Sequence, residues 1–236
     1  MIDTLAFDAD DTLWHNEHLF QDTQQKLAEI VGRYRPGEEI AEALYAVEMR
    51  NLALFGYGIK GFTLSMVEAA IDLTASRISA QDVHRIVALG KAMMTAPVEM
   101  LEGVEEVLAD VSGRYRTILI TKGDMVDQTS KIERSGLAGH FDEVEIVARK
   151  DAEAYSRVFD RHVIDPARTL MVGNSMPSDI LPVLELGGHA AHVPYAILWA
   201  HEAHDEDPVS ERFHRLERMS DLRDLLCHLR RPGRHS

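Results

Sequence analysis

The chain has 236 residues, of which 45% are hydrophobic and 27% charged, and its formal net charge is −14. This composition is typical of a soluble globular protein with a sizeable core, and it excludes disordered, collagen-like and coiled-coil classes. The acidic balance argues against a nucleic acid or an anionic membrane surface as a partner. A single cysteine, no signal-peptide pattern and no apolar run of ~18 residues together predict a cytoplasmic protein outside the membrane.

Short apolar runs that stop at polar residues predict the strands of the core. The first run is Thr4–Phe7, which ends at the carboxylates Asp8, Asp10 and Asp11. Later runs of the same character lie at 117–120, 144–147, 169–172 and 190–193. Helical patterns lie between these later runs. The alternation predicts an α/β core, with a Rossmann-like, doubly wound and mostly parallel sheet and helices on both of its faces.

The region between the first two strands has only helical periodicity. Ser79-Ala80-Gln81-Asp82 resembles a capping box at the start of one of these helices. The predicted organisation is therefore an α/β core, 1–14 and 98–236, interrupted by an inserted α-helical domain, 15–97. The polar tail contains one further amphipathic helix, through Met219 to Leu229.

Polar and charged side chains that could take part in a reaction lie directly after the carboxyl ends of the predicted strands. Because ligands bind at the carboxyl ends of parallel strands, these groups are expected to face one crevice. Carboxylate oxygens suit Mg²⁺, whereas a lysine and the backbone N–H groups before a helix suit phosphate oxygens. The sequence thus predicts a cation site beside an anion site, made from Asp8, Asp10, Thr121, Lys122, Gly123, Lys150 and Asp179.

Four motifs in this order resemble those of the haloacid dehalogenase-like superfamily, most members of which are phosphatases. Asp8-Ala9-Asp10-Asp11-Thr12-Leu13 is similar to its first motif, DxDxT. Thr121 and Lys150 match the second and third motifs, and Gly173–Asp179 resembles the fourth. The resemblance covers essentially the whole chain, and the helical insertion is similar to the family's helical (C1-type) cap.

The resemblance implies an activity and a role for each matched residue. Asp8 is the expected nucleophile, which forms an aspartyl-phosphate. Asp10 is expected to protonate the leaving oxygen and then to activate water. Thr121 and Lys150 would bind the phosphoryl oxygens, while Mg²⁺ would be held by Asp8, the Asp10 carbonyl and Asp179. The expected protein is a magnesium-dependent phosphatase for a small phosphorylated metabolite, either a monomer or a homodimer.

The fourth motif departs from the family pattern at two positions. Asn174 stands where many relatives carry Asp, and Ser178 stands where an acid or Asn is common. Asp179 is then the expected metal carboxylate. Asn174, Ser175 and Ser178 are expected to act on the metal indirectly, through water or through its ligands.

Three alternatives to the phosphatase remain. A 2-haloacid dehalogenase would share the nucleophile, but Asp10 argues against it because a departing halide needs no proton. A phosphomutase would need a second phosphate-binding group in the cap. A catalytically idle phosphate-binding protein would not need the complete set of nucleophile, acid, lysine and metal carboxylate.

Several other polar residues have structural interpretations. The segment 56–61 matches GxGxxG, but a helical pattern precedes it instead of a strand, so we interpret it as a cap turn that could present Tyr57 and Lys60 to substrate. Asp11 is interpreted as a solvated or capping acid and Lys131 as a solvated lysine. His201-Glu202-Ala203-His204 lacks a third metal ligand and is interpreted as a solvated turn.

Overall fold

The structure, a computed structural model, describes residues 1–36, 39–197, 199, 202 and 207–230. The chain forms two compact units. The first contains Met1–His15, Val98–Lys122 and Lys131–Ser236, and the second contains Asn16–Pro97 and Gly123–Ser130. Within the described ranges, no helix combines the length and the apolar character needed to cross a bilayer.

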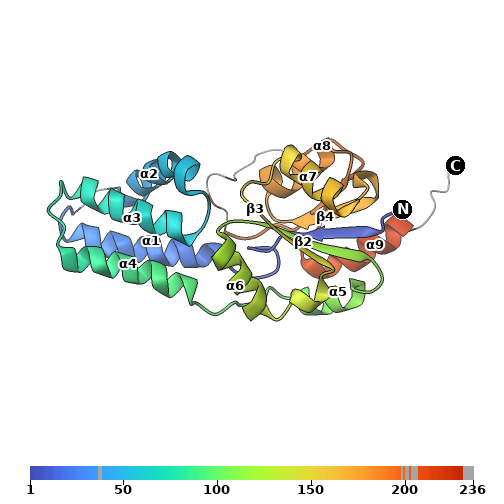
Figure 1. Ribbon diagram of the computed structural model, residues 1–236, viewed down its shortest axis with the longest axis horizontal. Helices are drawn as coiled ribbons and strands as arrows, with labels where there is room; N and C mark the ends of the chain where they lie inside the picture. Colours follow the sequence, from blue (N-terminus) through green and yellow to red (C-terminus); the bar gives the residue numbers. More distant parts are fainter. Residues whose placement is uncertain (37–38, 198, 200–201, 203–206, 231–236) are drawn as a thin grey trace. The chain divides into compact units, whose positions relative to one another are not determined.

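The first unit is built on a six-stranded parallel sheet with the order β3-β2-β1-β4-β5-β6 (Figure 1). The strands are β1 (Thr4–Phe7), β2 (Arg116–Lys122), β3 (Glu143–Val147), β4 (Thr169–Gly173), β5 (His189–His192) and β6 (Phe213–Arg215). This topology confirms the predicted Rossmann-like α/β class. The sequence did not indicate β6, because three residues with one apolar side chain make no recognisable run.

The central strand β1 fixes where the sheet can build a site. Phe7 lies opposite Leu119 of β2 on one side and Val172 of β4 on the other. The connections run outward from β1 in opposite directions, so the order of strands reverses there. Residues that follow β1 and β4 therefore meet at the topological switch point, where doubly wound sheets bind ligands.

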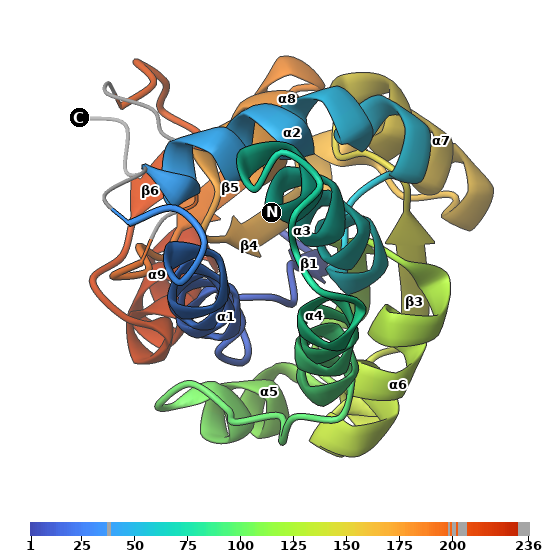
Figure 2. The ribbon, with the colours of Figure 1, turned by 90° about the vertical axis from the view of Figure 1, so that its left-hand side faces the viewer.

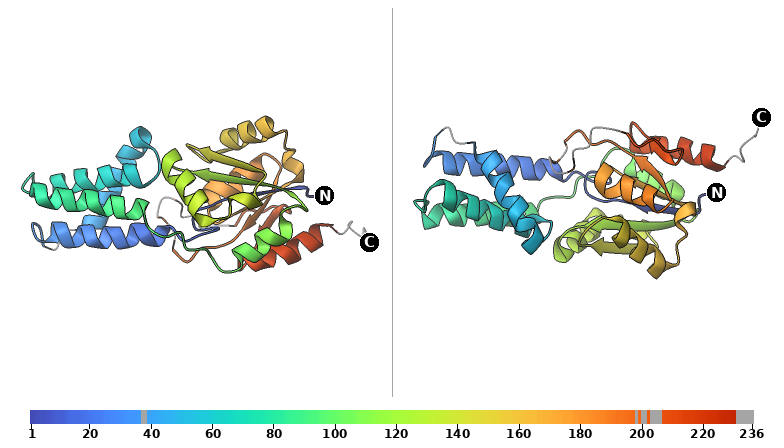
Figure 3. Two further views of the ribbon diagram at one scale, coloured as in Figure 1. Left: turned by 60° about the horizontal axis from the view of Figure 1, so that its bottom comes forward. Right: turned by 90° about the horizontal axis from the view of Figure 1, so that it is seen from above.

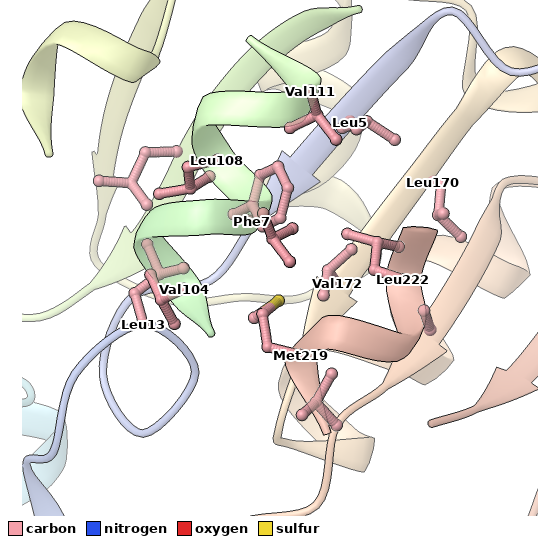
Figure 4. Packing of buried hydrophobic residues seen from close by; sticks show 14 of the residues in the cluster. Leu5, Phe7, Leu13, Val104, Leu108, Val111, Leu170, Val172, Met219 and Leu222 are labelled. Atoms are coloured by element: carbon pink, nitrogen blue, oxygen red, sulfur yellow. The ribbon is translucent and has the colours of Figure 1, made fainter. Parts of the chain in front are cut away.

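Helices cover both faces of this sheet. Helices α5 (Val104–Val111) and α9 (Leu222–Arg230) lie beside each other on one face, and α7 (Ala152–His162) and α8 (Leu181–Glu185) lie on the other (Figures 1 and 3). Strand residues alternate between the two faces. Leu5 and Phe7 accordingly pack in the cluster with α5 and α9 (Figure 4), whereas Ala6 packs with Tyr155 and Val183.

The second unit consists of helices and has a hydrophobic core of its own. Its helices are α1 (Glu17–Gly32), α2 (Ile40–Phe55), α3 (Ile59–Leu73) and α4 (Ala80–Met94), and Figure 2 looks along α1 and α4. Ser79 caps α4, since its hydroxyl accepts a hydrogen bond from the Asp82 N–H at 3.1 Å. Helix α6 (Met125–Ser135) contributes its residues up to Ser130 to this unit and the rest to the first.

Helices α3 and α4 approach closely at Gly90. A Cβ atom added there would lie 2.0 Å from Thr63 Oγ1 and 2.8 Å from its Cγ2. We expect Gly90→Ala to lower the free energy of unfolding by about 1–3 kcal/mol, because the two helices must separate. Gly32→Ala is the matched control, since no atom lies within 4 Å of the added Cβ. Urea denaturation measures both variants, and equal stabilities would contradict the close packing.

Candidate active site

The site begins with Asp8, the residue that follows β1. Its backbone N–H donates to the Val172 carbonyl at 2.9 Å, so its main chain continues the β1–β4 ladder. Its side chain is buried. One carboxylate oxygen, Oδ2, accepts a hydrogen bond from Thr12 Oγ1 at 2.8 Å, and the other contacts the Lys150 ammonium. The nucleophile candidate is therefore held by one hydroxyl and one cation.

Lys150 contacts both Asp8, the residue after β1, and Asp179 of the fourth motif. Its Nζ contacts Asp8 Oδ1 and lies 2.7 Å from Asp179 Oδ1. The side chains of Lys150 and Asp179 are each only 1% exposed. The structure thus brings together three predicted site residues from three distant parts of the sequence.

The buried charges of this cluster alter one another's protonation. Burial raises the pKa of the Asp8 carboxyl to about 7, and the negative charge of Asp179 adds to the rise while Lys150 opposes it. Burial alone would lower the pKa of Lys150, but the Asp179 and Asp8 carboxylates outweigh it and raise that pKa well above its usual value. The raised pKa favours the ammonium form of Lys150, which contacts both Asp8 and Asp179. Additional positive charge would stabilise this cluster.

Thr12 connects the first motif to the fourth. Its fully buried hydroxyl donates to Asp8 Oδ2, lies 3.2 Å from Asn174 Oδ1 and accepts from the Asn174 N–H at 3.1 Å. Asn174 is thus oriented by the residue that also orients the nucleophile candidate. The first motif includes Thr12, but the sequence does not indicate its contact with Asn174.

The fourth motif forms a tight turn around the Asp179 carboxylate. Asp179 lies in a one-turn π-helix, Met176–Ile180, and its Oδ2 accepts a hydrogen bond from the Ser175 N–H at 3.0 Å. The Ser175 hydroxyl in turn accepts from the Ser178 N–H at 3.2 Å. The N–H and hydroxyl groups of Ser175 therefore stabilise both the turn and the position of the Asp179 carboxylate.

Gly173 leaves the space that Asp179 occupies. A Cβ atom at this position would lie 2.3 Å from Asp179 Oδ2 and 2.6 Å from its Cβ. We expect Gly173→Ala to displace Asp179 and to lower the free energy of unfolding by about 1–3 kcal/mol. Gly139→Ala, where the added Cβ meets nothing within 4 Å, is the control. If thermal unfolding gave the same midpoint for both variants, the turn would have to tolerate the extra methyl group.

Asp10 has partners of its own. Its Oδ1 accepts a hydrogen bond from Trp14 Nε1 at 2.7 Å, and both of its carboxylate oxygens lie 2.7 Å from Lys131 Nζ. The interpretation of Lys131 as a solvated lysine is wrong, since the residue is buried. Asp11 is also buried, with φ of 61°, and its place in the turn before Trp14 explains why it does not face solvent.

Lys122 and Ser178 contact Glu202, which the sequence analysis interpreted as part of a solvated turn. Lys122 Nζ contacts the Glu202 carboxylate and lies 2.9 Å from Ser178 Oγ, which donates to Glu202 at 3.1 Å. The interpretation of this segment as a solvated turn is therefore wrong for Glu202. The rest of that segment, residues 201, 203 and 204, lies outside the described residues.

The remaining predicted site residues are Thr121 in the first unit and Gly123, Tyr57 and Lys60 in the second. Thr121 is buried near the carboxyl end of β2. Gly123 has φ of 146°, which favours glycine. Tyr57 precedes α3, and Lys60 Nζ lies 2.9 Å from Asp124 within the second unit. Lys60 thus has an ion-pair partner, and the element directly before the GxGxxG segment is the helix α2.

Two residues near the site gave no sequence signal. The Tyr155 hydroxyl lies 3.4 Å from Asp179 Oδ1, but its spacing along α7 also fits an ordinary core residue. His192, at the end of β5, donates from Nε2 to the Asn174 carbonyl at 2.9 Å. Burial lowers the pKa of His192, which favours the neutral ring. Only the folded chain reveals either contact.

The predicted metal ligands are oxygen atoms, which are the type of ligand that Mg²⁺ prefers. Among the described residues no three His, Cys, Asp or Glu side chains are grouped to hold a metal. The predicted set, however, consists of two carboxylates, from Asp8 and Asp179, and the main-chain carbonyl of Asp10. Oxygen donors of this type suit Mg²⁺, which binds few protein groups and keeps several waters. Burial, and after it the charge of Asp179, raises the pKa of Asp8, and a bound cation would favour the ionised carboxylate.

The Rossmann-like sheet, with a buried Asp-Lys-Asp cluster at its switch point, is typical of enzymes that use a carboxylate in their reaction. Residues 2–187 match the family model of the haloacid dehalogenase-like hydrolases. A haloacid dehalogenase-like family hydrolase from Xanthomonas campestris is 39% identical, with 97% of this chain and 91% of that chain covered and a TM-score of 0.87. The chain therefore belongs to the haloacid dehalogenase-like hydrolases, as its motifs predicted.

More distant structures share the fold. A 2-haloacid dehalogenase from Pseudomonas syringae pv. Tomato DC3000 is 17% identical, with 97% and 100% of the two chains covered and a TM-score of 0.67. A predicted phosphoglycolate phosphatase from Haemophilus somnus 129PT is 13% identical, with 95% and 98% covered and a TM-score of 0.64. No curated protein sequence matches the chain.

Proposed function

We propose that the protein is a magnesium-dependent phosphatase that hydrolyses a small phosphomonoester through an aspartyl-phosphate. The observation that carries this proposal is the second carboxylate, Asp10, two residues after Asp8 and held by its own cation. An alkoxide is a poor leaving group and must receive a proton as it departs. Asp10 supplies that need when it enters the step in its protonated form, and the proton that it later takes from water restores that form.

With Asp8 as the nucleophile and Asp10 as the acid and base, the reaction would proceed in two displacements. In the first, an Asp8 oxygen forms a bond to phosphorus, the bond from phosphorus to the ester oxygen breaks, and Asp10 gives its proton to that oxygen. In the second, water attacks the phosphorus, Asp10 takes a proton from the water, and Asp8 is released. Lys150 and Thr121 would hold the phosphoryl oxygens.

Asp8, Asp179 and the Asp10 carbonyl would hold Mg²⁺. When bound, the cation would neutralise charge on the carboxylates and on the phosphoryl group. Asn174 and Ser175 would keep its ligands in place, because Asn174 shares Thr12 with Asp8, and Ser175 binds Asp179. The helical unit would serve as the cap that selects the substrate and excludes water.

A 2-haloacid dehalogenase is the second candidate, and one feature favours it. Asp179 is the sole acid of the fourth motif, and Lys150 Nζ contacts both Asp179 and Asp8. In that reaction Asp8 would displace a halide from carbon, and Asp10 would have no proton to deliver.

A release screen separates the two functions. The wild-type protein is incubated with sugar phosphates, nucleotides, phosphorylated acids and 2-chloropropionate, and phosphate and chloride are both measured. We expect phosphate from at least one phosphomonoester and no chloride. Chloride release without phosphate release would replace the phosphatase with the dehalogenase.

Magnesium should be required for phosphate release, and calcium should be a poor substitute. In-line transfer needs the tight octahedral arrangement of Mg²⁺, whereas Ca²⁺ takes more ligands in a looser arrangement. The protein is treated with a chelator, and each cation is then added back. Full activity in the metal-free sample would contradict the requirement.

A further inference from the structure

Asp8 and Asp10 are two residues apart, yet the contacts described for their side chains are with different partners. Asp8 contacts Lys150 and Thr12, whereas Asp10 contacts Lys131 and Trp14. Lys131 Nζ lies 2.7 Å from both oxygens of the Asp10 carboxylate, and Trp14 Nε1 donates to one of them. Asp8 and Asp10 therefore each contact a different lysine.

The buried position of Lys131 on α6 argues against the view that its contact with Asp10 is an incidental surface ion pair. Its side chain is only 9% exposed, although Glu133 and Arg134 on the same helix are exposed. Burying an ammonium group is costly unless a carboxylate compensates for the lost water. Asp10 is the carboxylate that does so.

Trp14 is fixed by the turn that follows Asp8. The Asp11 N–H donates to the Trp14 carbonyl at 2.7 Å, and Asp11 has a φ of 61°. This turn folds the chain back, so the indole of Trp14 meets the Asp10 carboxylate. Trp14 is almost fully buried, which prevents the indole from moving away.

We propose that Lys131 is a positioning residue for Asp10, which it orients together with the Trp14 indole. The inference rests on the proposed phosphatase function. An aspartate side chain has two rotatable bonds, and proton transfer requires its carboxylate within hydrogen-bond reach of the reacting oxygen. Lys131 and Trp14 restrict those rotations and keep the Asp10 carboxylate from joining Asp8 and Asp179 around Lys150. Lys131 itself need not touch the substrate.

Burst kinetics with p-nitrophenyl phosphate and Mg²⁺ test this role. Nitrophenolate needs little protonation, so a misplaced Asp10 should slow mainly the release of phosphate from Asp8. In Lys131→Met we expect a burst of nitrophenolate close to the enzyme concentration. The steady rate should then be about 10- to 100-fold below that of the wild type. KM should fall by a similar factor, because the phosphoenzyme accumulates, so that kcat/KM changes less than about threefold. Arg134→Met, which removes an exposed cation from the same helix, should behave as the wild type.

A double-mutant cycle with Asp10→Asn shows whether Lys131 acts through Asp10. In the Asp10→Asn background, Lys131→Met should change the steady rate by less than about twofold. If Lys131→Met does not fold, Lys131→Gln is used in the same cycle, because its amide can still donate one hydrogen bond. Multiplicative losses, or a slow Lys131 variant without a burst, would overturn the positioning role. A wild-type protein that releases no phosphate would overturn the proposed function, and this role with it.

Discussion

Asp8→Asn should abolish turnover. A neutral amide cannot form the acyl-phosphate on which both displacements depend, and no other described carboxylate occupies its position after β1. Phosphate release is measured with the best substrate of the screen, and intact mass spectrometry is used to look for a phosphorylated enzyme. We expect neither product nor adduct from the variant.

Asp11→Asn is the matched control. It makes the same chemical change three residues further along the chain, at a φ of 61° that asparagine also adopts. Most activity should remain. An aspartyl-phosphate detected in Asp8→Asn, or equal losses in both variants, would show that Asp8 is not the nucleophile.

Asp10→Asn should slow alkyl phosphates more than aryl phosphates in the first displacement. General acid–base assistance is typically worth about 10²–10⁴-fold, and an alkoxide depends on it while p-nitrophenolate barely does. Single-turnover rates on an alkyl phosphate are compared with burst kinetics on p-nitrophenyl phosphate. The aryl substrate should give a burst, because the variant also lacks the group that activates water.

Equal losses on both substrates, with no burst, would contradict the acid–base role. Asp10 would then act only through its backbone carbonyl. The main argument against a dehalogenase would also be lost, since it depends on a proton delivered by this side chain.

The sequence predicted the sheet and the position of the site because buried parallel strands leave a clear signal. Apolar runs such as Thr4–Phe7 identify the strands, and the polar residues that follow them identify the carboxyl edge. That Asp8, Lys150 and Asp179 would lie near one another follows from this pattern. Their roles remain predictions, which the substitutions above address.

The sequence could not indicate which side chains orient these groups. Lys131 lies in a helical pattern, and helical spacing does not reveal that its face meets Asp10. Glu202 lies far along the chain from Lys122 and Ser178, so its contact with them depends on how the segment after β5 folds. Thr12 was visible in the first motif, but its second contact, with Asn174, requires β1 and β4 to be neighbours.

The place of β1 at the centre of the sheet also affects the order in which the protein can fold. This strand leaves the ribosome before the other strands of the sheet, yet Thr4 lies opposite Arg116 on one side and Thr169 on the other. Closing loops of this length is slow, so β1 must wait for partners that are synthesised much later. Helices α1 to α4 pack mainly on one another and can assemble in the meantime. We therefore expect the apolar strand Thr4–Phe7 to stay unpaired while β2 and β4 are synthesised, when a chaperone would protect it.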